Sequence, residues 1–107
     1  MTTAPKAEIL KISDLAAYQE GAIVSRQITM AEGGNVTLFA FDQGQELSEH
    51  TAPFDALLHV LDGEVEVRIS GKAFQLKTGE AIILPGGQPH AVKAGKKFKM
   101  LLTMIHV

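Results

Sequence analysis

The 107-residue sequence contains no cysteine. This absence excludes disulfide bonds, thiolate catalysis, and zinc or iron–sulfur sites with cysteine ligands. No apolar run approaches the ~18 residues that span a bilayer, so a membrane is not an expected partner. The first residues, MTTAPKAEILKI, lack the long apolar core of a signal peptide, which predicts a cytoplasmic protein.

A large excess of one charge is also missing. The formal net charge is -2, and the lysines and arginines are scattered along the chain. Without a basic patch, nucleic acid is not an expected partner either. The composition, 46% hydrophobic and 21% charged, is typical of a folded protein. The length fits a single domain over residues 1–107, and small domains often gain stability by pairing, so we expect a homodimer.

Helical character is scarce and confined to the N-terminal part. The stretch SDLAAYQEG, residues 13–21, has a candidate N-cap in Ser13 and a candidate stop in Gly21. It is long enough for one or two turns only. Such low helical content argues against alternating β–α units.

From Ala22 onward the pattern is typical of β-strands. Segments rich in β-branched, aromatic and other apolar residues are separated by turns that mostly contain glycine: 22–30, 35–42, 56–61, 64–70, 73–77, 80–85 and 96–107. In the fourth segment Val65, Val67 and Ile69 alternate with charged residues, which predicts one buried and one solvated face. Seven or eight short strands predict a sandwich or a barrel.

Two histidines lie in segments that are bracketed by glycines. His50 follows Gly44 by six residues and precedes Gly63 by thirteen, and the stretch GEAIILPGGQPH, residues 79–90, ends at His90. With these residues the sequence resembles the cupin family. The first family motif, G-x5-H-x-H-x3-4-E-x6-G, frames residues 44–63. The second, G-x5-P-x-G-x2-H-x3-N, frames residues 79–94 with four matching positions: Gly79, Pro85, Gly87 and His90. The resemblance implies an all-β, single-domain jelly-roll barrel with a short N-terminal helical turn.

The departures from the motifs concern the metal ligands. In cupins two histidines and a glutamate of the first motif, with the histidine of the second, hold a divalent metal. In this chain Ala52 stands at the second histidine position, Ala56 at the glutamate position and Ala94 at the asparagine position. Only His50 and His90 remain as metal ligands. The resemblance therefore implies either no cofactor or a weakly held zinc, iron, manganese or nickel ion.

Three hypotheses follow. In the first, Ala52 and Ala56 leave a small apolar pocket with His50 and His90 at its rim, and the barrel binds a small organic molecule. In the second, the protein is a metal-dependent enzyme of the dioxygenase, isomerase or decarboxylase type, with further ligands drawn from Glu46, Glu49 or Asp55. In the third, the chain is a pairing module whose N-terminal segment and C-terminal strand pack across a two-fold axis.

Other interpretations remain for single residues. The alternative for His90 is a purely structural role, in which a ring nitrogen bonds a backbone carbonyl at the barrel edge. Strand parity turns Asp55 and His59 away from the barrel interior, unless the preceding loop shifts.

Overall fold

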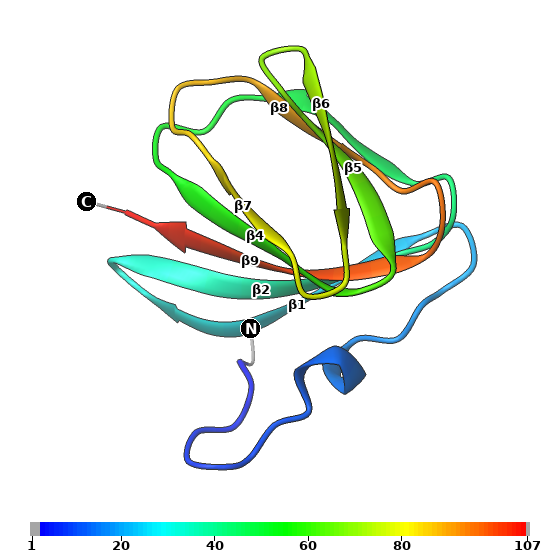
Figure 1. Cartoon of the computed structure of the whole chain (residues 1–107). Helices are drawn as coiled ribbons and strands as arrows, with labels where there is room; N and C mark the ends of the chain where they lie inside the picture. Colours follow the sequence, from blue (N-terminus) through cyan, green and yellow to red (C-terminus); the bar gives the residue numbers. More distant parts are fainter. Residues whose placement is uncertain (1–2, 107) are drawn as a thin grey trace.

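The computed structural model describes residues 3–106. Over that range the chain forms nine β-strands and one 3₁₀ turn, and Figure 1 shows the strands wrapped into a barrel. The elements are η1 (Ile12–Leu15), β1 (Ile23–Ala31), β2 (Gly34–Phe41), β3 (Glu46–His50), β4 (Ala56–Asp62), β5 (Glu64–Ile69), β6 (Lys72–Lys77), β7 (Ala81–Leu84), β8 (His90–Lys93) and β9 (Phe98–Ile105). The expected all-β architecture is confirmed.

The N-terminal helical turn is shorter than the sequence pattern suggested. It ends at Leu15, and the cap position is Lys11, which makes no side-chain capping hydrogen bond. Ser13, the predicted N-cap, lies inside the turn, where its carbonyl accepts a hydrogen bond from Lys99 Nζ. Gly21 has a positive φ of 69° and serves the turn into β1 rather than a helix end. None of the described helical segments is long and apolar enough to cross a membrane.

The strands form two antiparallel sheets. Sheet A has the order β1-β2-β9-β4-β7, and sheet B has the order β3-β8-β5-β6. Only the pairs β1–β2 and β5–β6 are hairpins of consecutive strands, and the other pairings join distant segments. β9 lies between β2 and β4, so the last strand of the chain occupies the centre of sheet A.

The main core fills the space between the two sheets. Phe41 and Phe98 are fully buried, with ring centroids 4.6 Å apart. Burying side chains of this size contributes roughly 1.5–3 kcal/mol each. The predicted alternation in β5 is confirmed, because Val65, Val67 and Ile69 are buried while the residues between them face outward.

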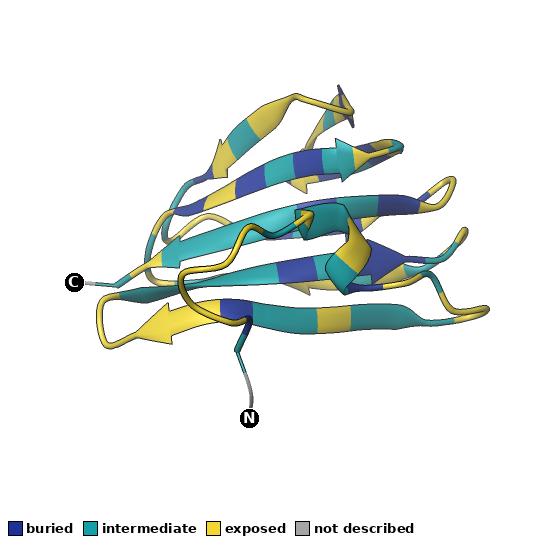
Figure 2. Cartoon of the chain, turned by 90° about the horizontal axis from the view of Figure 1, so that it is seen from below, coloured by how far each residue is buried: buried dark blue, intermediate teal, exposed yellow. Residues whose placement is uncertain are grey.

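A second, smaller core lies on the outer face of sheet A. The N-terminal strap, residues 3–21, crosses in front of β1, β2 and β9 (Figure 2). Its attachment includes a hydrogen bond from Ala4 N to Ile28 O at 2.9 Å and the side chain of Tyr18, whose hydroxyl donates to Asp62. Apolar strap residues pack there on Ile28, Leu38 and Ala40 of the sheet.

Candidate functional site: a histidine pair at one end of the barrel

His50 and His90 lie side by side on neighbouring strands. His50 is the last residue of β3, His90 is the first residue of β8, and the two are paired across the ladder. Their Nε2 atoms are 3.0 Å apart, and the rings meet edge to face with centroids separated by 4.3 Å. The structure therefore brings together the two imidazoles that the motif frames singled out.

The backbone fixes how this pair shares its protons. His50 Nδ1 lies 2.9 Å from the carbonyl oxygen of Ser48, and a carbonyl only accepts, so His50 Nδ1 carries a hydrogen. In the neutral ring His50 Nε2 is then an acceptor, and His90 Nε2–H donates to it. Within the described part of the chain, His90 Nδ1 is buried and has no hydrogen-bond partner. The pair thus presents one donor and one acceptor that face each other.

The surroundings favour the neutral form of His90. The side chain is buried, and burial is the main reason why its pKa lies below the usual value of 6.5. The adjacent His50 lowers the pKa further, because two imidazolium charges repel at this distance, while the backbone of Gln88 raises it. At neutral pH the buried ring is therefore an uncharged hydrogen-bonding group.

Two loops hold the histidines in place. The loop after β3 and the turn before β8 are joined by hydrogen bonds from Gly87 N to Ala52 O and from Gly86 N to Asp55 Oδ1, both 2.8 Å long. A Cβ atom on Gly86 would lie 2.8 Å from Pro53 O. Only glycine allows the two loops to approach so closely without displacement.

Asp55 has a structural role in joining the two loops, which the sequence did not indicate. It was considered as a metal ligand, and instead its carboxylate accepts the backbone N–H of Gly86. The sequence feature behind this contact is Gly86 in the stretch Pro85-Gly86-Gly87, and the second motif allows any residue at that position. The motif pattern alone could not show that this glycine meets the first-motif loop.

The alanine positions differ from each other. Ala56 is buried in β4, where it is paired with Leu84 on one side and Met104 on the other. Ala52 is half-buried in the loop, and its carbonyl oxygen accepts the hydrogen bond from Gly87 N. Ala94 is fully buried and exchanges backbone hydrogen bonds with the segment at residues 44–45, which is a structural role.

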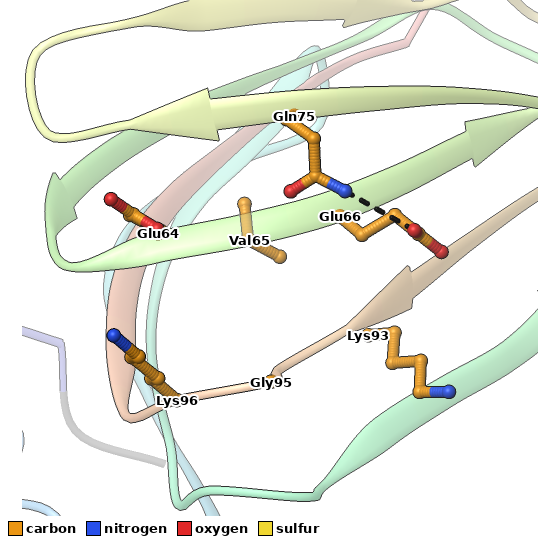
Figure 3. A pocket seen from close by; sticks show the side chains of 7 residues that line it. All are labelled: Glu64, Val65, Glu66, Gln75, Lys93, Gly95 and Lys96. Atoms are coloured by element: carbon orange, nitrogen blue, oxygen red, sulfur yellow. Dashed lines mark hydrogen bonds between the residues drawn. The ribbon is translucent and has the colours of Figure 1, made fainter.

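The hollows that the structure describes are not lined by the histidine pair or by the two alanines. Five hollows within residues 3–106 have volumes of about 230–730 Å³, and none of them is lined by His50, Ala52, Ala56 or His90. Figure 3 shows one of about 320 Å³ on the outer face of sheet B, where Gln75 donates to Glu66. Its charged lining matches an ordinary solvated sheet face, and the pocket at the alanines stays a prediction.

The side chains around the histidine pair do not form a metal site. Within residues 3–106 no three histidine, aspartate or glutamate side chains come together in a way that could hold an ion. Glu46, Glu49 and Asp55 therefore do not complete the pair. Two imidazoles alone fall short of the three protein ligands of a catalytic zinc site, so the residues present do not fit a metal held by this chain alone.

Three features define the class of protein: a small β-barrel, a buried histidine, and two motif loops joined by hydrogen bonds. The cupin domain family model matches residues 37–106, so the chain belongs to the cupin family. It is 27% identical over 97 residues to tetracenomycin polyketide synthase protein TcmJ of Streptomyces glaucescens, covering 86% of this chain. The chain spans only 65% of that relative's length.

Solved structures support the same assignment. A conserved protein of unknown function from Streptococcus pyogenes superposes with a TM-score of 0.91 at 28% identity, over 100% of this chain and 96% of that one. A cupin 2 conserved barrel domain protein from Leptotrichia buccalis is 41% identical with a TM-score of 0.84, over 87% of this chain and 45% of its own. The family and the fold expected from the two motifs are confirmed.

Proposed function

We propose that this cupin binds a small organic molecule that carries a hydroxyl group, without a metal held by the chain alone. The observation that carries the proposal is the 3.0 Å contact between the Nε2 atoms of His50 and His90. One of these atoms donates and the other accepts. Once the two rings move apart, a ligand hydroxyl could enter between them, donate to His50 and accept from His90, so that one neutral hydrogen bond is replaced by two.

The charge state of His90 supports a hydroxyl over a carboxylate. Because the pKa of His90 is lowered by burial, the buried ring is neutral at neutral pH. A carboxylate offers only acceptors and would need a proton taken up by the pair. A phenol or alcohol satisfies the donor and the acceptor as they stand.

Partly buried apolar side chains of the main core suit the body of such a ligand. Leu47, Leu102 and Met104 pack against the main core and are each only partly buried. The name of the relative TcmJ associates it with a polyketide synthase, which agrees with a small organic ligand.

Proton NMR of the histidine ring resonances tests the proposal. Phenol and benzoate serve as matched probes at neutral pH. Saturable shifts of the His50 and His90 signals with phenol, and clearly weaker ones with benzoate, are the expected result. The response should vanish in His50→Ala and persist in His59→Ala, which removes a histidine from the outward-facing side of β4. Absence of any saturable shift with phenol, or equal shifts in His50→Ala, would count against the proposal.

A metal-dependent enzyme is the second candidate. One observation favours it: the Nε2 atoms converge while the Ser48 carbonyl orients the His50 ring, as outer partners orient metal-binding histidines. Titration with Zn²⁺ by calorimetry separates the candidates. Tight one-to-one binding that is lost in both His50→Ala and His90→Ala would favour the enzyme, and weak binding would favour the metal-free ligand site.

A further inference from the structure

The inner face of sheet A changes from apolar to polar along one row of paired residues, which we call the first row. Its members, in the order β7, β4, β9 and β2, are Leu84, Ala56, Met104 and Asn35. Residues paired directly across strands point to the same face of a sheet. Ala56 and Leu84 belong to the main core, and Met104 packs against it. The pairing therefore places the side chain of Asn35 on the inner face as well.

The neighbouring row repeats this change. Its members, in the order β7, β4, β9, β2 and β1, are Ile82, Leu58, Leu102, Thr37 and Gln27. Thr37 Oγ1 donates to Asn35 Oδ1 at 3.4 Å, which agrees with the placement of both polar side chains on one face. Where the rows reach β2 and β1, amide and hydroxyl groups replace the apolar side chains of the core. We call Gln27, Asn35 and Thr37 the polar end.

The inner face is closely packed at one end of the barrel and open at the other. Along β9 the inward side chains change from the fully buried Phe98 to the half-buried Met104. Along β2 they change from the fully buried Phe41 to the half-buried Asn35. A hollow of about 730 Å³ borders the polar end, and all three of its residues line this hollow. That volume lies within the range of small-molecule sites.

The polar end lies at the same end of the barrel as the histidine pair. The loops at residues 51–55 and 85–89 connect the first row to the two histidines. Figure 1 shows both loops on the same side of the barrel as the turn between β1 and β2 and the end of β9. Neighbouring strands are about 4.8 Å apart, so two strand spacings, or about 10 Å, separate Ala56 from Asn35.

The chemistry of the polar end favours a neutral partner group. Amides and hydroxyls both donate and accept hydrogen bonds, and neither row contains an ionisable side chain. Arg26 lines the same hollow, but it is paired with Leu38 of the second core, and its Nη1 donates to Leu15 O at 3.5 Å. The guanidinium therefore belongs to the outer side of sheet A. A carbonyl, amide or hydroxyl group suits the polar end better than a carboxylate or phosphate.

We propose that the polar end binds a second, neutral group of the ligand whose hydroxyl is held by the histidine pair. The ligand is then an elongated, mainly apolar molecule with a carbonyl, amide or hydroxyl group about 10 Å from the first hydroxyl. Leu102 and Met104 adjoin the polar end in their rows and contact the middle of the molecule. The inference rests on the function proposed for the histidine pair, and it adds the length of the ligand and its second polar group.

Two biphenyl probes test the proposal by calorimetry at neutral pH. The two oxygens of 4,4′-dihydroxybiphenyl are separated by about the length that the first row predicts, and 4-hydroxybiphenyl lacks the second hydroxyl. Beyond the statistical advantage of a symmetric probe, the dihydroxy compound should bind about fivefold more tightly, because one more hydrogen bond between neutral groups forms. Equal affinities for the two probes would overturn the polar end and leave the histidine site standing.

Asn35→Leu and Thr37→Val remove polar atoms of the polar end with little change of volume. Each should abolish most of the preference for the dihydroxy probe and leave the binding of 4-hydroxybiphenyl nearly unchanged. Thr103→Val makes the same chemical change on the outer face of β9, where Thr103 is paired with Val36 of the second core, and should keep the preference. A preference that persists in both polar-end variants, or that is lost equally in Thr103→Val, would refute the assignment.

The side-chain amide of Asn35 gives a direct signal, because Asn35 is the only asparagine in the sequence. Its nitrogen-15 resonance should shift on saturation with 4,4′-dihydroxybiphenyl and much less with 4-hydroxybiphenyl, whereas the methyl signal of Met104 should shift with both. An Asn35 amide that is unchanged at saturation would contradict the proposal. If neither probe bound while phenol still shifted the histidine signals, only the polar end would be excluded. If phenol failed as well, the proposed function would fall with it.

Discussion

Gly86→Ala is the substitution that most directly tests how the candidate site is held together. The added Cβ would lie 2.8 Å from Pro53 O and 3.0 Å from the Cα and carbonyl carbon of Phe54. All of these are backbone atoms, so no flexible side chain can move aside. Gly86 has no positive φ, and the cost is therefore crowding rather than backbone strain.

The destabilisation expected for Gly86→Ala follows from the need to separate the two loops. Overpacking of this kind costs about 1–3 kcal/mol. The displacement would also weaken the hydrogen bond from Gly86 N to Asp55 Oδ1. We expect a loss of about 2 kcal/mol in the free energy of unfolding, or a fall of about 10 °C in Tm for a domain of this size.

Gly95→Ala provides the matched control. Gly95 has no atom within 4 Å of its added Cβ and no positive φ, so its stability should change by about 0.5 kcal/mol or less. Thermal unfolding by circular dichroism measures both variants. In Gly86→Ala the His50 and His90 ring signals should shift as well, because their loops are forced apart. A Tm equal to that of Gly95→Ala would show that the two loops are not in close contact.

Two further predictions concern ionisable groups. Because the pKa of His90 is lowered in the folded chain, the unfolded chain takes up the proton first as the pH falls, so the stability from the neutral ring is intact above pH 6.5 and declines below it. Urea unfolding above and below pH 6.5 should show a smaller loss of unfolding free energy in His90→Gln than in the wild type. Identical losses in the two proteins would contradict the assignment. Burial and then Asp62 raise the pKa of Tyr18 above 10.0, so the stability it adds is lost as the pH rises past that value. Tyr18 is the only tyrosine in the sequence, so near-ultraviolet absorbance reports its ionisation, and tyrosinate should appear only well above pH 10.0. An earlier onset of ionisation in Asp62→Asn would support the contact between Tyr18 and Asp62. An onset near pH 10.0 in the wild type would contradict it.

Many strands and turns of the barrel could be predicted from local sequence patterns. The alternation of Val65, Val67 and Ile69 predicted a strand with one buried face, and the buried face is the one observed. The turn at residues 85–89 and the position of His90 after it followed from Pro85 and the two glycines. These features depend on near neighbours in the sequence, which is why the pattern was sufficient.

The strands that carry the histidines were not predicted. The segment ELSEH, residues 46–50, has no row of β-branched residues, yet it forms β3 because Glu46 and Leu47 pair with Lys93 and Val92 of β8. Tertiary pairing overrides weak local preference here. Contacts such as the one between Gly86 and Asp55 join residues 31 positions apart, and one sequence does not show which distant loop a glycine meets.

The second core was missed for a related reason. The segment at residues 35–42 is apolar on both faces, which is typical of a strand covered on both sides. Phe39 and Phe41 face the main core, whereas Leu38 and Ala40 face the strap. The pattern indicated double coverage, but it did not indicate that the cover would come from the first twenty residues.

The histidine pair is poorly explained by stability. His90 stands on the interior side of β8 beside the buried Val92, where an apolar side chain would pack without a polar atom to satisfy. A buried polar atom without a hydrogen bond of good geometry, such as its Nδ1, generally costs about 1–3 kcal/mol, and a hydrogen bond between two neutral groups returns only about 1 kcal/mol. His50 itself is exposed and covers little. Departures of a fold from its own packing rules are expected at functional or strained sites, so the two rings and the hydrogen-bonded loops around them support the ligand site proposed above.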